Sequence, residues 1–102
     1  MYRLVISELA HNDLEHISDY IVTELASPNA AIDFLDDVAK CYERLRENPF
    51  LYEQCRDLRL QKEGYRRAVI KNYILIYKVL EPEKEVVIYR FFYGRQEYLR
   101  LI

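Results

Sequence analysis

The chain has 102 residues, of which 51% are hydrophobic, and it contains only two glycines and three prolines. This composition predicts one small globular domain over residues 1–102 and excludes a disordered or low-complexity chain. No run of about 18 apolar residues is present, and the first residues lack the long apolar region of a signal peptide. We therefore expect a cytoplasmic protein.

The formal net charge of −2 is unevenly distributed along the chain. Residues 1–55 carry eleven acidic and four basic side chains, whereas residues 56–102 carry eleven basic and six acidic ones. Such asymmetry favours a basic face for nucleic acid or an acidic peptide, although acidic helix faces in solvent would produce it as well. The two cysteines and two histidines lack zinc-ligand spacing, so we expect neither a metal nor a cofactor.

The N-terminal segment predicts a strand followed by a helix. Residues 2–6 are rich in strand-forming side chains, and Ser7 is a favoured N-cap. Apolar residues then recur every three or four positions and predict one buried stripe, formed by Ala10, Leu14, Ile17, Ile21 and Leu25. Asp13 lies on the opposite side of this helix, where we expect it to face solvent.

A second helix is predicted to begin at Ser27-Pro28, because serine caps helices and proline is favoured in the first turn. Its apolar stripe is expected to consist of Ala31, Phe34 or Leu35, Val38, Tyr42 and Leu45. Asn48-Pro49 ends it. The short connection between the two helices predicts an antiparallel helical hairpin.

The second half of the chain predicts a sheet. After a loop at residues 50–56, strand-like segments occupy residues 57–61, 65–71, 73–80 and 85–93, and residues 95–102 could form one or two helical turns. Short turns require antiparallel neighbours. The order β-α-α-β-β-β-β therefore predicts an α+β fold, with the helical hairpin packed on one face of a small antiparallel sheet.

Both faces of this sheet are expected to be apolar. Ile74 and Ile76 alternate with three residues that point to the other face, namely Tyr73, Leu75 and Tyr77. Because the hairpin can cover only one face, the other one is a candidate binding surface, unless loops or a second copy cover it. The residues expected on this binding surface are Arg66, Lys71, Ile74, Ile76 and Arg90.

Several short motifs occur in an order that resembles a known family. The motifs near the N-terminus are Ala10, Asp13-Leu14 and Tyr20-Ile21. They are followed by Gly64-Tyr65-Arg66-Arg67 and, at the end, by the stretch YGRQEY at residues 93–98. Over essentially the whole chain, this pattern resembles toxins of the RelE/ParE superfamily, the stable partners in bacterial type II toxin–antitoxin modules. The resemblance implies a curved sheet and a cognate antitoxin that shields the basic surface.

The superfamily contains two kinds of toxin, and the resemblance implies different roles for the same residues. RelE-like members cut mRNA on the ribosome. In that case Arg67 and Arg95 would stabilise the phosphate, and Tyr98 would act as a base or orienting group. RelE-type nucleases usually carry a cation where this chain has Tyr65 and Ile74.

ParE-like members instead poison DNA gyrase, without catalysis of their own. The predicted hairpin and the Gly64–Arg67 segment resemble ParE more closely, so DNA gyrase is the favoured target. The alternatives are a ribosome-dependent mRNA endoribonuclease and a non-toxic binding module that retains the fold. The two adjacent arginines alternate between faces, so at most one of them shares a site with Arg95.

Overall fold

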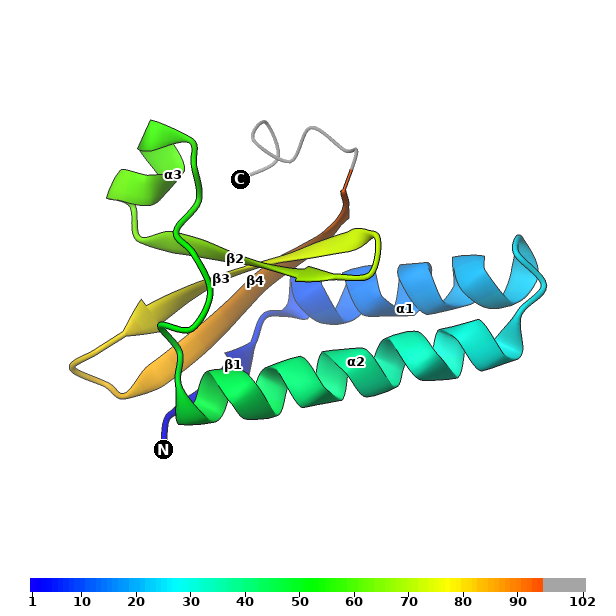
Figure 1. Ribbon diagram of the computed structural model, residues 1–102, viewed down its shortest axis with the longest axis horizontal. Helices are drawn as coiled ribbons and strands as arrows, with labels where there is room; N and C mark the ends of the chain where they lie inside the picture. Colours follow the sequence, from blue (N-terminus) through cyan, green and yellow to red (C-terminus); the bar gives the residue numbers. More distant parts are fainter. Residues whose placement is uncertain (95–102) are drawn as a thin grey trace.

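The computed structural model describes residues 1–94 and shows helices packed against a small open sheet (Figure 1). The expected C-terminal helical turns lie outside the described residues. The elements are β1 (Arg3–Ile6), α1 (Glu8–Thr23), α2 (Pro28–Glu47), α3 (Leu58–Lys62), β2 (Tyr65–Ile70), β3 (Tyr73–Leu80) and β4 (Glu85–Tyr93). None of the helices within residues 1–94 is long and apolar enough to cross a lipid bilayer.

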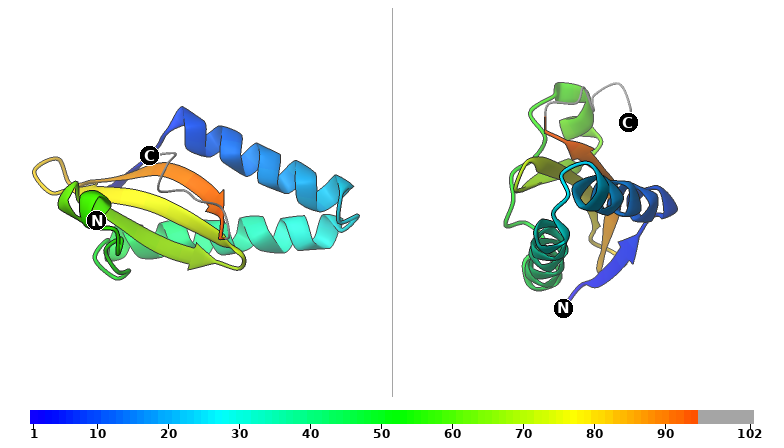
Figure 2. Two further views of the ribbon diagram at one scale, coloured as in Figure 1. Left: turned by 90° about the horizontal axis from the view of Figure 1, so that it is seen from above. Right: turned by 90° about the vertical axis from the view of Figure 1, so that its right-hand side faces the viewer.

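The two long helices begin where their caps predict. The Ser7 hydroxyl accepts a hydrogen bond from the backbone N–H of Ala10 at 3.0 Å, and the Ser27 hydroxyl accepts one from Ala30 at 3.3 Å. These bonds satisfy N–H groups that have no partner inside the helix. The helices α1 and α2 lie side by side on one face of the sheet (Figure 2), which confirms the predicted hairpin.

The sheet has the strand order β1-β4-β3-β2. The strands β2, β3 and β4 follow one another through short turns and pair antiparallel, as predicted. The first strand, β1, lies at the other edge and pairs parallel to β4, with Val5 opposite Val87. Because β1 ends at Ile6, the second half of β4 extends beyond its neighbour on that side.

The main core lies between the helical hairpin and the sheet. Phe34 and Leu45 of α2 pack there with Leu75, Tyr77 and other buried residues of the strands. Tyr77 is fully buried, and its hydroxyl donates a hydrogen bond to the carbonyl of Pro49 at 2.8 Å. Burial raises the pKa of this phenol. Tyr77 is therefore a core residue.

The predicted strand at residues 57–61 is wrong, because this segment forms the helix α3. The Asp57 carboxylate accepts a hydrogen bond from the Leu60 backbone N–H at 3.0 Å and so caps the helix. Two leucines two positions apart would share one face of a strand, but they lie on nearly opposite sides of a helix. Accordingly Leu60 is 0% exposed, whereas Leu58 is 70% exposed.

The helix α3 and the loop before it also correct the expectation of an open second face. Leu60 of α3 and Cys55 of the loop pack with Ile74, Ile76 and other side chains in a second buried cluster. Ile74 is 6% exposed and Ile76 is 0% exposed. The expected place of Ile76 on a binding surface is therefore wrong, because its side chain lies beneath the surface. Ile74 is mostly buried as well, but it lines an open hollow together with Arg67.

Candidate functional site

The strand β2 places its two adjacent arginines on opposite faces, as expected from the alternation of side chains. Arg66 lies on the hairpin side, where its Nη1 donates a hydrogen bond to the carbonyl of Tyr52 at 2.7 Å. Its guanidinium also stacks over the Phe50 ring, 5.0 Å from the ring centroid. Arg67 points to the second face, on the same side as Ile76. Arg66 therefore helps to hold the loop and does not share a site with Arg67.

Arg67 and Arg90 lie at the same level of the sheet, one on each side of Ile76. The register pairs Arg67 with Ile76 across β2 and β3, and Ile76 with Arg90 across β3 and β4. Neighbouring strands are about 4.8 Å apart, so the two arginine backbones are about 10 Å apart. We call Arg67 and Arg90 the arginine pair.

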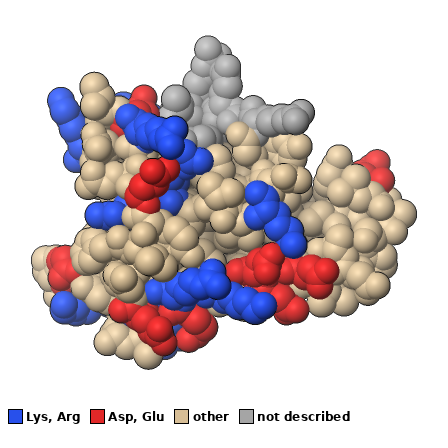
Figure 3. Space-filling view, in the orientation of Figure 1, with Lys and Arg blue, Asp and Glu red and all other residues tan. Residues whose placement is uncertain are grey.

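The second face near the arginine pair is partly basic. In Figure 3, Lys and Arg side chains predominate over α3 and the adjoining end of the sheet, whereas Asp and Glu side chains are mixed with Lys and Arg over the helical hairpin. Arg67 also lines an open hollow of about 320 Å³ with Val69, Lys71 and Asn72. Lys71 itself pairs with Asp37 of α2 at 3.2 Å. The uneven charge of the sequence thus becomes a difference between two parts of the surface.

Arg67 is held by the loop before α3. Its backbone N–H donates to the carbonyl of Glu53 at 3.1 Å, and its Nη1 lies 3.6 Å from the Glu53 carboxylate. The Nε atom of Arg67 is buried and has no hydrogen-bond partner within residues 1–94. The loop therefore holds this mostly buried side chain in place.

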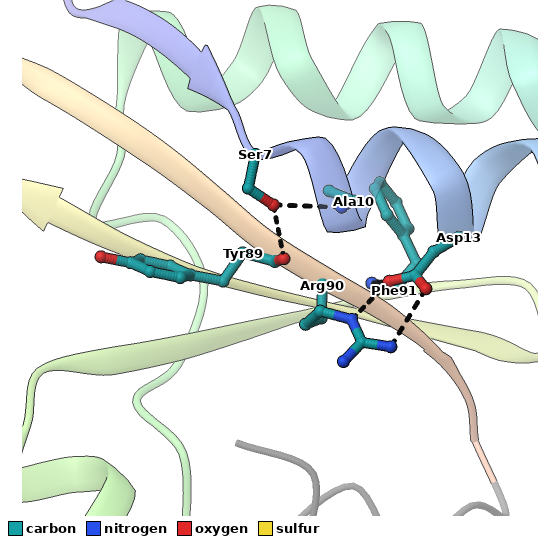
Figure 4. Close-up of polar contacts among 6 residues, drawn as sticks. All are labelled: Ser7, Ala10, Asp13, Tyr89, Arg90 and Phe91. Carbon is teal, nitrogen blue, oxygen red and sulfur yellow. Dashed lines mark hydrogen bonds and ion pairs between the residues drawn. The ribbon is translucent and has the colours of Figure 1, made fainter.

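Arg90 is held by the start of α1 (Figure 4). The Asp13 carboxylate accepts hydrogen bonds from Arg90 Nε at 2.8 Å and Arg90 Nη2 at 3.1 Å, and also from the backbone N–H of Phe91 at 2.9 Å. One turn earlier, the Ser7 hydroxyl donates to the carbonyl of Tyr89 at 2.7 Å. The bond to Asp13 raises the pKa of Arg90, so Arg90 stays charged.

These contacts give Asp13 a role that the sequence did not predict. Asp13 was expected to face solvent, but only 14% of its side chain is exposed, and it bridges α1 to β4. The expected placement on the opposite side of the helix was wrong, because Asp13 is three residues after Ala10 and so lies at the edge of the apolar stripe, where a helix borders the sheet. This spacing was the available signal. That position alone does not reveal the strand it contacts.

Comparison with known proteins identifies the family. A family model described as the ParE toxin of the type II toxin–antitoxin system, parDE, matches residues 4–98. The chain belongs to the ParE toxin family. This ParE-family chain is thus a ParE/RelE-type toxin of a toxin–antitoxin module.

Two solved structures resemble this ParE-family toxin. The chromosomal ParDE system from P. aeruginosa superposes with a TM-score of 0.73 and 21% identity, covering 91% of this chain and 96% of that one. The toxin–antitoxin complex RelBE2 from Mycobacterium tuberculosis superposes with a TM-score of 0.62 and 18% identity, covering 90% and 96%. At these identities the likeness establishes the fold. A comparison with curated protein sequences gives no match.

The predicted catalytic residues divide into two groups in this ParE-family toxin. Arg67 is placed on the second face beside Arg90. The other two, Arg95 and Tyr98, lie outside the described residues, so the expected constellation of all three stays a prediction. Tyr65 and Ile74, which replace cations of RelE-type nucleases, are both buried in the second cluster.

Proposed function

We propose that this chain inhibits bacterial growth by acting on DNA gyrase and that a cognate antitoxin neutralises it. The match of the ParE toxin family model to residues 4–98 carries this proposal. The second face supports it, because the buried Tyr65 and Ile74 fill this face with apolar packing where RelE-type nucleases usually carry cations. A buried, unpaired cation at either position would lower the free energy of unfolding, so this face does not suit the cation pattern of RelE-type nucleases.

The antitoxin is proposed to contact the exposed parts of the basic surface. Lys71 and Arg90 remain proposed contact residues, and Arg67 joins them through the hollow that it lines with Lys71. Arg66 lies on the opposite face and bonds the loop, so a contact to Arg66 would be separate from theirs. The acidic groups that now pair with Lys71 and Arg90 come from α2 and α1. An acidic antitoxin segment could therefore add to charge pairs that already exist at this surface.

The decisive experiment separates growth inhibition from its target. The chain is induced alone and then together with the protein encoded beside it, and colony formation is scored. Purified chain is added to gyrase in a supercoiling assay. We expect colony loss that the neighbouring protein reverses, and a dose-dependent fall in supercoiling. Growth arrest with unchanged supercoiling would reject gyrase as the target.

A ribosome-dependent mRNA endoribonuclease is the second candidate, and the arginine pair favours it. Two cations at one level of a sheet can stabilise the charge that develops on a phosphate during cleavage. In this reading Arg67 and Arg95 act as the catalytic cations, Arg90 adds a positive charge at the same level of the sheet as Arg67, and Tyr98 serves as the base or orienting group. Primer extension on translated mRNA after induction should then reveal new codon-linked cuts. Harmless expression without any antitoxin would instead support a binding module that has lost toxicity.

A further inference from the structure

An irregularity in β4 decides which face Arg90 occupies. The pairing of β3 with β4 shifts between Ile76 and Tyr77, so that Ile76 lies opposite Arg90 and Tyr77 lies opposite Ile88. Tyr89 is therefore an extra residue, which defines a β-bulge. Without it, strict alternation would turn Arg90 toward the helices and Phe91 toward the second face.

The packing on each side confirms this change of alternation. Ile88 and Phe91 are both buried in the core beneath the helices, although residues three positions apart would lie on opposite faces of a regular strand. Tyr89 packs against the second cluster, and the Arg90 guanidinium stacks over the Phe92 ring, 4.8 Å from the centroid. The bulge thus places both Tyr89 and Arg90 on the second face.

The bulge is held from outside the sheet. At this point β1 has ended, and the first two turns of α1 lie where a neighbouring strand would continue. Ser7 bonds the carbonyl of the extra residue Tyr89, and Asp13 bonds the N–H of Phe91. The same carboxylate takes two donors of Arg90. A guanidinium has five N–H donors, so others remain for a ligand.

We propose that Asp13 is a positioning residue: together with Ser7 it maintains the bulge at Tyr89 and keeps the Arg90 guanidinium on the second face, ready to contact an acidic group of the toxin's target. The inference rests on the proposed growth-inhibiting function. It does not depend on whether the target is gyrase or the ribosome. Bulges occur frequently beside functional sites, where they redirect a side chain.

A double-mutant cycle tests this role. The variants are Asp13→Asn, Arg90→Gln and their combination, with Glu15→Gln as the control, because Glu15 is an exposed acid of the same helix. Each is induced without antitoxin and scored for colony formation at matched soluble protein level, and each purified protein is unfolded with urea. Residues in direct contact couple strongly, so we expect each single variant to lose about tenfold in growth inhibition. The double variant should lose no more than Arg90→Gln, and the control should match the wild type.

A second variant distinguishes positioning from stability or charge. Arg90→Lys keeps the charge but cannot make the planar two-donor contact with Asp13. We expect it to lose about tenfold in growth inhibition, because a lysine at this site is not oriented by the carboxylate. This variant also tests the proposal if Asp13→Asn does not fold.

The outcomes separate the two proposals. If the wild-type chain inhibits growth and the Asp13 and Arg90 variants inhibit it equally well, the positioning role is wrong and the proposed function stands. Fully additive losses in the double variant, or full inhibition by Arg90→Lys, also overturn the positioning role. If the wild-type chain does not inhibit growth, the proposed function fails, and the positioning role fails with it.

Discussion

Asp13 and Phe91 are joined by a hydrogen bond of 2.9 Å between a helix side chain and the backbone of β4, in the half of that strand that extends past β1. The carboxylate takes the place of a strand neighbour, because β1 ends before this point. A backbone N–H at a sheet edge needs a partner or water, and here the partner comes from α1. The same carboxylate holds Arg90, so one side chain supports both the fold and the arginine pair.

Replacing Asp13 with alanine should lower the free energy of unfolding by about 2 kcal/mol, because a mostly buried carboxylate with charged and backbone donors is lost. Urea unfolding measures this effect. The matched control is Glu15→Ala on the exposed side of α1, which should change stability by less than about 0.5 kcal/mol. Equal effects of the two substitutions would contradict the bridging role of Asp13.

The two leucines of α3 offer a test of how the second face is covered. Leu60→Ala should cost about 2–5 kcal/mol, because it leaves a cavity in the second cluster. Leu58→Ala should change stability by less than about 0.5 kcal/mol, because its side chain is exposed. Chemical unfolding of both variants checks the prediction. Similar costs for both leucines would indicate that this segment is not a helix with one buried side.

Gly64 ends α3 with a backbone conformation that favours glycine. Its φ angle is +89°, and its N–H donates to the carbonyl of Gln61 at 3.0 Å. Gly64→Ala should cost about 1 kcal/mol, because a side chain disfavours positive φ. Thermal or urea unfolding measures the loss, with Lys62→Ala on exposed α3 surface as the control. A Gly64 variant as stable as the wild type would show that the turn adopts another conformation.

Alkaline conditions should destabilise the fold through buried groups that resist ionisation. Burial raises the pKa of the Cys41 and Cys55 thiols and of the Tyr77 phenol. In the unfolded chain these groups ionise near pH 8.5 for cysteine and about 10 for tyrosine. The unfolded chain then binds fewer protons than the folded one, so the free energy of unfolding falls as pH rises.

Urea unfolding between about pH 7 and pH 10 measures this dependence, since the range spans the ordinary thiol and phenol pKa values. The free energy of unfolding should keep its full value below the thiol pKa of the unfolded chain, and it should decline above that pKa. Cys41→Ala should reduce the slope around the thiol pKa, measured relative to its own stability at neutral pH. A wild-type profile that stays flat throughout this range would contradict the prediction.

The candidate site was only partly predictable from the residues. Alternation along β2 correctly separated Arg66 from Arg67. Arg90 was recognised as a member of the surface, but its place beside Arg67 depends on the bulge at Tyr89. A bulge is defined by the pairing of one strand with another, and the residues of β4 alone do not indicate where that pairing shifts. The partner of Asp13 could not be predicted for the same reason, because it depends on how the strands pair.

Local patterns were enough to predict the helical hairpin, the three consecutive antiparallel strands and the resemblance to toxins, because caps, turns and hydrophobic periods act over a few residues. Three features emerged only from the folded chain: Leu58 and Leu60 belong to a helix, α3 covers Ile74 and Ile76, and Asp13 holds Arg90. All three features depend on contacts between segments far apart in the chain. The free energy of such contacts cannot be inferred from the residues of one segment alone.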